Sequence, residues 1–275
     1  MKSMSKAASP RVKIIGIVNA TPDSFADGGS FFAFDAALAQ AERLIFEGAD
    51  ILDIGGESTR PGADPVPLEE ELRRVMPLIA AIREKSAITI SIDTYKAETA
   101  RRALAAGANI INDISALRYD AEMTALVVES GAPIVLTHMQ GDPKTMQDHP
   151  AYEDVVREVG DFFRAKVAAL TALGVPKEKI ILDPGIGFGK TRSHNLSLLK
   201  HLDAFTGLGC PLLLAHSRKR FLGGLTGTTK PEERDLPTAV VAALAMAKGI
   251  SMVRVHNVAV TRQALIVAEA IAAAR

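Results

Sequence analysis

Cysteine is nearly absent from this 275-residue chain, and so is any excess of charge of one sign. The single Cys210 excludes a disulfide framework and a cysteine-based zinc site within one chain. Lysine plus arginine equals aspartate plus glutamate at 32 each, so no global field points to nucleic acid or a membrane as a partner. No apolar run approaches the ~20 residues that cross a bilayer. Any anion-binding site must therefore be local.

Aromatic residues are also scarce, at 5%, whereas apolar residues make up 48% of the chain. Few aromatics with abundant Ala, Leu, Ile and Val favour an α/β protein, whose buried parallel strands are rich in β-branched residues. The first ten residues are rich in Ser, Lys and Ala and lack the hydrophobic core of a secretion signal. We expect residues 1–10 to be a disordered or frayed terminus and the protein to be cytoplasmic.

Short apolar runs alternate with amphipathic stretches along the whole chain. Strands are expected at 12–18, 51–54, 88–92, 109–111, 133–136, 179–182, 211–215 and 252–255, and helices at 34–48, 68–85, 96–106, 122–130, 155–173, 196–202, 238–248 and 258–274. Eight such units without a break in composition predict one α/β domain, a closed (β/α)8 TIM barrel over residues 11–275. A doubly wound open sheet is the alternative, but it usually has fewer strands, and no GxGxxG follows the first strand.

Every expected strand ends in a polar or charged residue, and barrels of this kind carry their active sites at that end. These residues are Asn19, Asp53, Asp93, Asn112, His138, Asp183, the Ser-Arg-Lys group at 217–219, and Arg254 with His256. Eight such positions converge on a single mouth. For any one of them the alternative is a bond to the barrel backbone, and Asp53 is equally suited to orienting its neighbours.

Three of these residues form a hydrogen-bond acceptor group: Asp93, Asn112 and Asp183. A carboxylate pairs bidentately with an N–C–NH2 fork, so the group suits a ligand edge that carries several N–H donors. The glycine-rich loop at 185–190 lacks the spacing of a phosphate loop, and its central Phe188 suits stacking on a flat ligand.

A second group is cationic and comprises Arg60, Lys219, Arg254 and His256. Its last three members follow the final strands, where barrels often hold phosphate. A buried arginine needs an anion or a carboxylate partner, whereas the Ser-Arg-Lys-Arg run could also be a solvated basic turn.

Asn19, with Asp23 and Asp27 nearby, offers oxygen ligands for Mg2+, which on its own is a weak signal.

Eight short motifs together resemble the dihydropteroate synthase family, in family order and from about residue 12 to the C-terminus. They are GIVNATPDSF at 16–25 with DGG at 27–29, DIGGESTRPG at 53–62, SIDT at 91–94, IND at 111–113, HMQG at 138–141, DPG at 183–185, SRK at 217–219 and RVH at 254–256. The resemblance implies a transferase of folate biosynthesis. Such an enzyme condenses 6-hydroxymethyl-7,8-dihydropterin pyrophosphate with 4-aminobenzoate to give 7,8-dihydropteroate and pyrophosphate.

The resemblance also implies roles for individual residues. The pterin would bind Asp93, Asn112, Met139, Asp183, Gly187, Phe188 and Lys219. The pyrophosphate would lie on Asn19, Arg60, Arg254 and His256 with Mg2+, for which Asn19 is the protein ligand. The 4-aminobenzoate would contact Phe25, Thr59, Pro61, Phe188, Lys219 and Arg220. Asp93, Lys219, Arg60 and Asp183 would carry the catalysis.

An aniline amine is a weak nucleophile, so we expect an SN1-like displacement in which the pterin carbon becomes cationic before the amine attacks.

The family often has glycine before its Ser-Arg-Lys and serine after it, whereas this chain has Ala215 and His216 before it and Arg220 after it. This departure affects only the details of the 4-aminobenzoate pocket. Such barrels are commonly dimeric, and the apolar final helix could supply a homodimer interface.

Two rival functions share part of this pattern. A pterin-binding methyltransferase barrel that acts with a corrinoid protein would need the acceptor group but not all of the cations. A non-enzymatic pterin- or phosphate-binding module would be expected to lack some acceptors or cations.

The loop within residues 51–63 (ILDIGGESTRPGA) is expected to be a mobile cover that brings Thr59 and Arg60 over the bound pterin pyrophosphate.

Overall fold

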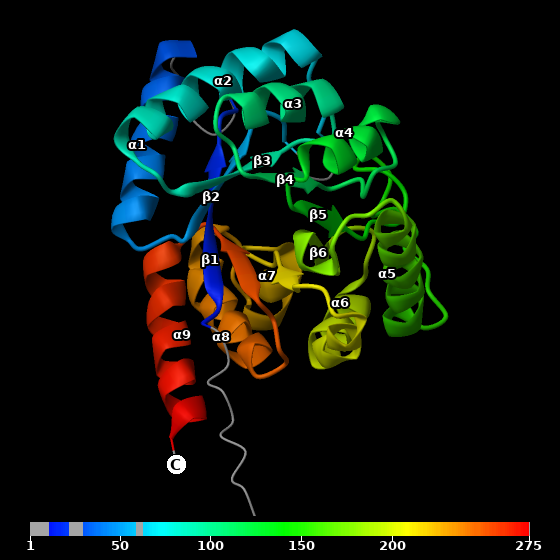
Figure 1. Ribbon diagram of the computed structural model, residues 1–275. Helices are drawn as coiled ribbons and strands as arrows, with labels where there is room; N and C mark the ends of the chain where they lie inside the picture. Colours follow the sequence, from blue (N-terminus) through cyan, green and yellow to red (C-terminus); the bar gives the residue numbers. More distant parts are fainter. Residues whose placement is uncertain (1–10, 22–29, 59–62, 275) are drawn as a thin grey trace, which may run out of the picture.

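The computed structural model describes residues 11–21, 30–58 and 63–274, and of residues 30–33 the backbone alone. Eight parallel strands form its centre, with helices around them (Figure 1). The strands are β1 Lys13–Asn19, β2 Ile51–Gly55, β3 Thr89–Asp93, β4 Ile110–Asp113, β5 Ile134–Thr137, β6 Ile180–Asp183, β7 Leu213–Leu214 and β8 Met252–Val255. Their order is β6-β5-β4-β3-β2-β1-β8-β7, and a parallel bridge between Leu182 and Leu212 joins the two ends. The predicted (β/α)8 barrel is confirmed.

A helix follows each strand. The α-helices are α1 Ser30–Phe46, α2 Leu68–Lys85, α3 Ala97–Ala105, α4 Glu122–Ser130, α5 Val155–Ala172, α6 Arg192–Lys200, α7 Arg220–Thr226, α8 Asp235–Met246 and α9 Val258–Ala273. Three 3-10 helices are η2 Lys177–Lys179, η3 Leu202–Leu208 and η4 Glu232–Arg234. In the described part of the chain, no helix is long and apolar enough to cross a membrane.

Four predicted boundaries were wrong. Helix α1 begins at Ser30 rather than at 34. Helix α6 begins at Arg192, four residues before the expected start, because Thr191 caps it in a reciprocal capping box with His194. Helix α8 begins at Asp235 rather than at 238, and the apolar run at 211–215 contributes only two residues to β7. Apolar periodicity does not detect a polar first turn, which explains why the predicted starts of α6 and α8 are too late in the sequence.

The strands separate two apolar layers. Seven inward side chains fill the bottom of the barrel: Ile15, Ile51, Ile110, Val135, Ile181, Leu213 and Met252. Alternate residues of the same strands point outward into a larger core beneath the helices. Side chains two residues further along each strand therefore stack above the inner layer, toward the carboxyl end. Asp53, Asn112, Asp183 and Arg254 occupy this level.

The single-domain boundaries at 11–275 stay a prediction, and residues 1–10 lie outside the described ranges. So do Phe25, Thr59, Arg60 and Pro61 from the expected substrate contacts, with Asp23 and Asp27.

Candidate active site at the carboxyl end of the barrel

Four strands bring the acceptor residues and one cation to the same level of the barrel. Asn112 stands two residues above Ile110, Asp183 two above Ile181, and Arg254 two above Met252. Asp93 ends β3 and pairs in register with Asn112 on β4. All three acceptors are at most 6% exposed. The predicted convergence of these side chains is therefore present in the fold.

Arg254 lies across two carboxylates. Its Nε donates to Asp53 Oδ2 at 2.5 Å and its Nη2 donates to Asp93 Oδ2 at 2.6 Å. Asn112 Nδ2 donates to the same Asp53 oxygen at 3.1 Å. Asp53 thus orients both a cation and an amide, which is the second of the two roles considered for it.

Charge and burial oppose each other in this group. The pKa of Asp93 is raised to about 7. Burial is the main cause, the nearby Asp53 carboxylate adds to it, and Arg254 opposes both. Burial alone would lower the pKa of Arg254, but Asp53 and Asp93 raise it overall. Arg254 therefore stays charged while Asp93 titrates near neutrality.

Each carboxylate also keeps an unused acceptor. Asp53 Oδ1 and Asp93 Oδ1 are buried, and neither has a hydrogen-bond partner among the residues that the structure describes. A buried acceptor without a donor is costly, so such an atom usually marks the place of a missing partner. A ligand that carries N–H groups would supply one.

Lys219 and the loop after β6 form the opposite side of the site. The Lys219 ammonium lies 4.2 Å from the centre of the Phe188 ring and donates to the backbone oxygen of Ile186. A Cβ atom on Gly187 would approach Lys219 Cδ to 2.9 Å, so glycine allows the lysine to pass. Lys219 and Phe188, with the ammonium over the ring, thus form a lysine–phenylalanine wall beside Asp183.

Asp183 and Lys219 influence each other. Burial raises the pKa of Asp183, opposed by Lys219 and by the N–H of Gly185, which donates to Asp183 Oδ1 at 2.9 Å. Burial lowers the pKa of Lys219 to about 8, opposed by Asp183. The site holds an ionisable carboxylate and an ionisable amine in one place, a pattern found at functional sites.

The residues after β7 separate in direction. Ser217 Oγ lies 2.8 Å from His256 Nδ1 and accepts the His256 N–H at 3.0 Å, which ties the ends of β7 and β8 together. Arg218, in a left-handed conformation at φ 56°, instead makes a two-pronged ion pair with Asp235 of α8 at 2.6 and 2.8 Å. The basic run is therefore not a single cationic patch.

The remaining expected contacts lie around this centre. Asn19 ends β1 beside Gly55 and is half-buried, whereas Met139 is fully buried after β5. Arg220 is exposed as the first residue of α7. His138, considered as a possible residue of the mouth, is buried, and its ring bonds to Lys190.

Glu57 anchors the base of the loop after β2, a role that the sequence did not predict. Its carboxylate accepts from Tyr95 at 2.6 Å, from Lys96 at 2.5 Å and from the Val66 N–H at 3.2 Å. Lys96 also pairs with the buried Glu71 at 2.8 Å. Residues on both flanks of 59–62 are therefore held together.

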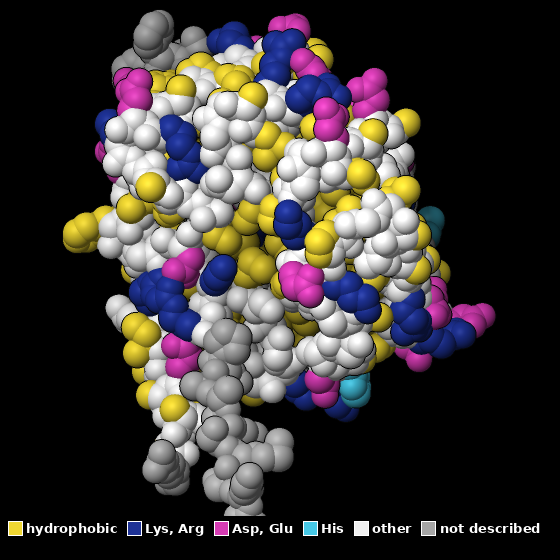
Figure 2. All heavy atoms as spheres, viewed as in Figure 1, with side chains coloured by type: hydrophobic (Ala, Val, Ile, Leu, Met, Phe, Trp, Pro, Cys, Tyr) yellow, Lys and Arg dark blue, Asp and Glu magenta, His cyan; other side chains and the backbone are white. Residues whose placement is uncertain are grey.

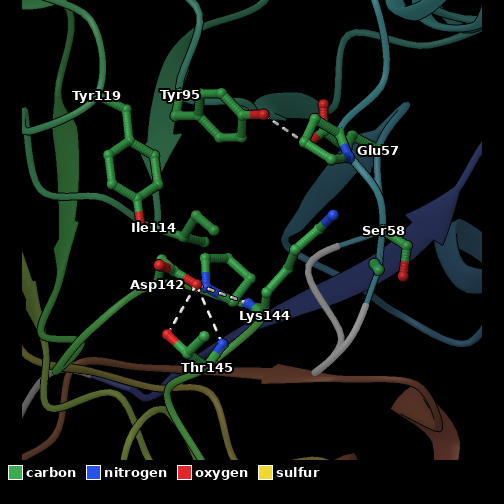
Figure 3. A pocket seen from close by; sticks show the side chains of 11 residues that line it. Glu57, Ser58, Tyr95, Ile114, Tyr119, Asp142, Lys144 and Thr145 are labelled. Carbon is green, nitrogen blue, oxygen red and sulfur yellow. Dashed lines mark hydrogen bonds between the residues drawn. The ribbon is translucent and has the colours of Figure 1, made fainter.

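A cavity of about 370 Å³ opens among the loops that follow β2 to β5, and sequence reasoning missed it as well (Figure 3). Tyr95 and Tyr119 meet edge to face at 5.4 Å on one side of it. Its lining consists of Glu57, Ser58, Ala63, Pro65, Tyr95, Ile114, Tyr119, Asp142, Pro143, Lys144 and Thr145. The available signal was the position of two of the three tyrosines in the loops that follow two strands: Tyr95 comes two residues after β3, and Tyr119 comes six residues after β4.

No cluster of three or more His, Cys, Asp or Glu residues that could hold a metal occurs among the residues described. Asn19 offers one amide oxygen at the mouth. A single protein ligand suits Mg2+, which often takes most of its ligands from water and substrate phosphate.

The fold and the acceptor group define an enzyme of the pterin-binding class. A family model described as "Pterin binding enzyme" matches residues 15–256. A dihydropteroate synthase from Synechocystis is 46% identical over 261 residues, covering 95% of this chain and 90% of that protein.

Solved structures agree. Xanthomonas albilineans dihydropteroate synthase with 4-aminobenzoic acid superposes with a TM-score of 0.91 at 46% identity, covering 97% of this chain and 95% of that one. The same enzyme in complex with 7,8-dihydropteroate gives 0.88 at 43% identity, covering 98% and 97%. The chain belongs to the dihydropteroate synthase family.

Proposed function

We propose that this enzyme joins 6-hydroxymethyl-7,8-dihydropterin pyrophosphate to 4-aminobenzoate, releasing pyrophosphate and giving 7,8-dihydropteroate for folate biosynthesis. The observation that carries the proposal is the meeting of buried acceptors with a lysine–phenylalanine wall at one end of the barrel. The family membership supports it independently.

The pterin fits between these two sides. Asp93, Asn112 and Asp183 would accept from or donate to its polar edge, and Asp93 Oδ1 is a buried acceptor that such an edge would satisfy. Phe188 and Met139 would pack against the ring faces, with Gly187 allowing close approach. Lys219, whose ammonium lies beside the Phe188 ring, would donate to the pterin ring.

The pyrophosphate fits above Arg254. Two of the five guanidinium N–H donors serve Asp53 and Asp93, and the others are available for phosphate oxygens. His256 directly follows β8, Asn19 ends the neighbouring strand β1, and Arg60 comes from the loop after β2. When bound, Mg2+ held by Asn19 would neutralise charge on the departing pyrophosphate.

The 4-aminobenzoate would lie at the outer edge of the pterin. Phe188 and Lys219 would line its pocket, and Arg220, the first residue of α7, would bind the benzoate carboxylate. Phe25, Thr59 and Pro61 complete the proposed set.

The electrostatics favour the SN1-like course. The C–O bond to pyrophosphate breaks first, and its electron pair leaves with the pyrophosphate, which Arg254, His256 and Arg60 stabilise. The positive charge left on the pterin lies close to Asp93 and Asp183. The aniline nitrogen then forms the new C–N bond and loses a proton.

The test is incubation of the protein with pterin pyrophosphate, labelled 4-aminobenzoate and Mg2+. Labelled dihydropteroate and one equivalent of pyrophosphate are expected. Tight pterin binding without product would favour the methyltransferase class instead. Omission of Mg2+, with a chelator present, should lower the rate and weaken pyrophosphate binding.

We also propose that the protein is a cytoplasmic homodimer. Leu236, Val240 and Leu244 stand at successive turns of α8, each at least 49% exposed. Ile266, Val267 and Ile271 are at least 55% exposed on the neighbouring α9, where hydrophobic side chains show at the lower left of Figure 2. Apolar exposure on two packed helices is typical of an interface.

A further inference from the structure

Lys190 is a buried lysine whose ammonium binds three neutral acceptors. The residue is 3% exposed. Its Nζ donates to His138 Nδ1 at 2.9 Å, to the His138 backbone oxygen at 3.2 Å and to the Phe188 backbone oxygen at 2.9 Å. An ammonium has three N–H donors, and these contacts use all of them.

This arrangement is costly. Burial, with the repulsion of Lys219, places the pKa of Lys190 well below its ordinary value, and Asp183 only partly opposes this. Burial and the cation of Lys190 also lower the pKa of His138 to about 2, so the ring is neutral and can accept. An apolar side chain of similar length would fill the space without this cost.

The three acceptors lie on two different loops. His138 directly follows β5 and precedes Met139, whereas Phe188 belongs to the loop after β6. The His138 N–H donates to the backbone oxygen of Asp183 at 2.9 Å, which joins the residue after β5 to the end of β6. The hydrogen bonds of Lys190 join the same two loops at a second place. Lys190 is therefore the tie between the two loops that carry Met139 and Phe188.

The two loops are in such close contact that a small separation would change the shape of the site. A Cβ atom on Gly185 would stand 1.9 Å from the His138 oxygen, and one on Gly189 would stand 2.5 Å from the Gln140 oxygen. Tyr152 adds a bond from its hydroxyl to the Gly189 oxygen at 3.0 Å. The tie is part of a tightly packed joint.

We propose that Lys190 is a positioning residue that fixes the distance between Met139 and Phe188 and thereby selects a flat pterin ring. This inference rests on the proposed function, because it concerns the same slot. It predicts that the loss of this side chain weakens pterin binding more than 4-aminobenzoate binding, since Phe188 is the one residue of this joint among the proposed 4-aminobenzoate contacts.

The experiment compares Lys190→Met with Lys179→Met. Lys179 also donates to a backbone oxygen, that of Gly131 at 2.6 Å, but directly before β6 at the other end of the barrel. Binding of 6-hydroxymethylpterin is measured by calorimetry, and both KM values are measured in steady state. Lys190→Met should weaken pterin binding about tenfold or more, as expected for losing charged hydrogen bonds, whereas Lys179→Met should change it less than twofold.

The split between substrates decides the matter. The KM for pterin pyrophosphate should rise about as much as the pterin Kd, and the KM for 4-aminobenzoate should rise distinctly less. Equal rises in both KM values, or an unchanged pterin Kd in a folded Lys190→Met variant, would overturn the inference. If the methionine variant does not fold, Lys190→Gln keeps two N–H donors at shorter reach and should weaken pterin binding to a smaller extent; wild-type affinity in that variant overturns the inference too. Failure of the unmodified protein to bind pterin would instead refute the proposed function, and this inference with it.

Discussion

The Arg254 guanidinium donates to the Asp93 carboxylate at 2.6 Å, and each group acts on the pKa of the other. Arg254 restrains the effect of burial on Asp93, whose pKa is nevertheless raised to about 7. Asp93 in turn helps to raise the pKa of Arg254. A residue proposed to hold the pyrophosphate thus also sets the charge of a residue proposed to hold the ring.

Replacing Arg254 should therefore change the pH dependence of pterin use. In Arg254→Gln the lowering effect on Asp93 is lost, so the acid limb of kcat/KM for pterin pyrophosphate should move up by about one pH unit or more, in addition to a general loss of activity. Arg102→Gln, which removes a surface ion pair with Glu98, is the control. An acid limb at the same pH in both variants would refute this coupling.

Asp93 should reduce the stability of the folded protein as the pH rises. Its pKa goes from 3.8 to about 7 on folding, so its stabilising contribution is complete below pH 3.8 and is lost as the pH rises through 7. Asp93→Asn lacks this dependence. Relative to the parent, its free energy of unfolding should increase between pH 5 and pH 8, while pterin binding is lost. Urea unfolding at both pH values measures this, with the exposed Asp161→Asn as a control that should show no such trend.

Two glycines with similar backbone angles should differ sharply in their tolerance of alanine. Gly174 has φ 89°, and no atom of the described residues lies within 4 Å of the position that a methyl group would take there. Gly174→Ala should therefore cost about 1–2 kcal/mol from the left-handed conformation alone. Gly185 has φ 66°, but its Cβ would collide with the His138 oxygen. Gly185→Ala should cost distinctly more and should also weaken pterin binding. Equal melting temperatures for the two variants would contradict the close contact of the loops.

A charge on the apolar face of α8 should produce monomers. Leu244 is 69% exposed, and Leu244→Asp should shift the mass measured by light scattering from dimer to monomer. Phe46→Asp, at the end of α1 and 92% exposed, should leave the dimer intact. A dimer that persists in Leu244→Asp would place the interface elsewhere.

The barrel was predictable because its signals are local: apolar runs, glycine stops and polar strand ends recur in every unit. The convergence of Asp93, Asn112 and Asp183 followed from their positions at the carboxyl ends of successive expected strands. The choice of partner did not follow, because Arg254 and Asp53 are 201 positions apart in the chain and meet only when the barrel closes. Arg218 looked like a member of a basic run, and only the packing of α8 shows that it turns toward Asp235. The role of Lys190 could not be predicted, because the sequence alone does not show whether a lysine is buried or exposed.

Closure of the barrel is uneven. The register between β1 and β2 contains five residue pairs, whereas the Leu182–Leu212 bridge and a hydrogen bond from Leu182 to Pro211 join β6 to β7. Asp183 and Phe188 stand on one side of that seam, and Lys219 stands on the other. A pterin bound between them, as proposed, would therefore bridge the joint with the fewest residue pairs among the described strands, and the substrate itself would hold that side of the barrel together.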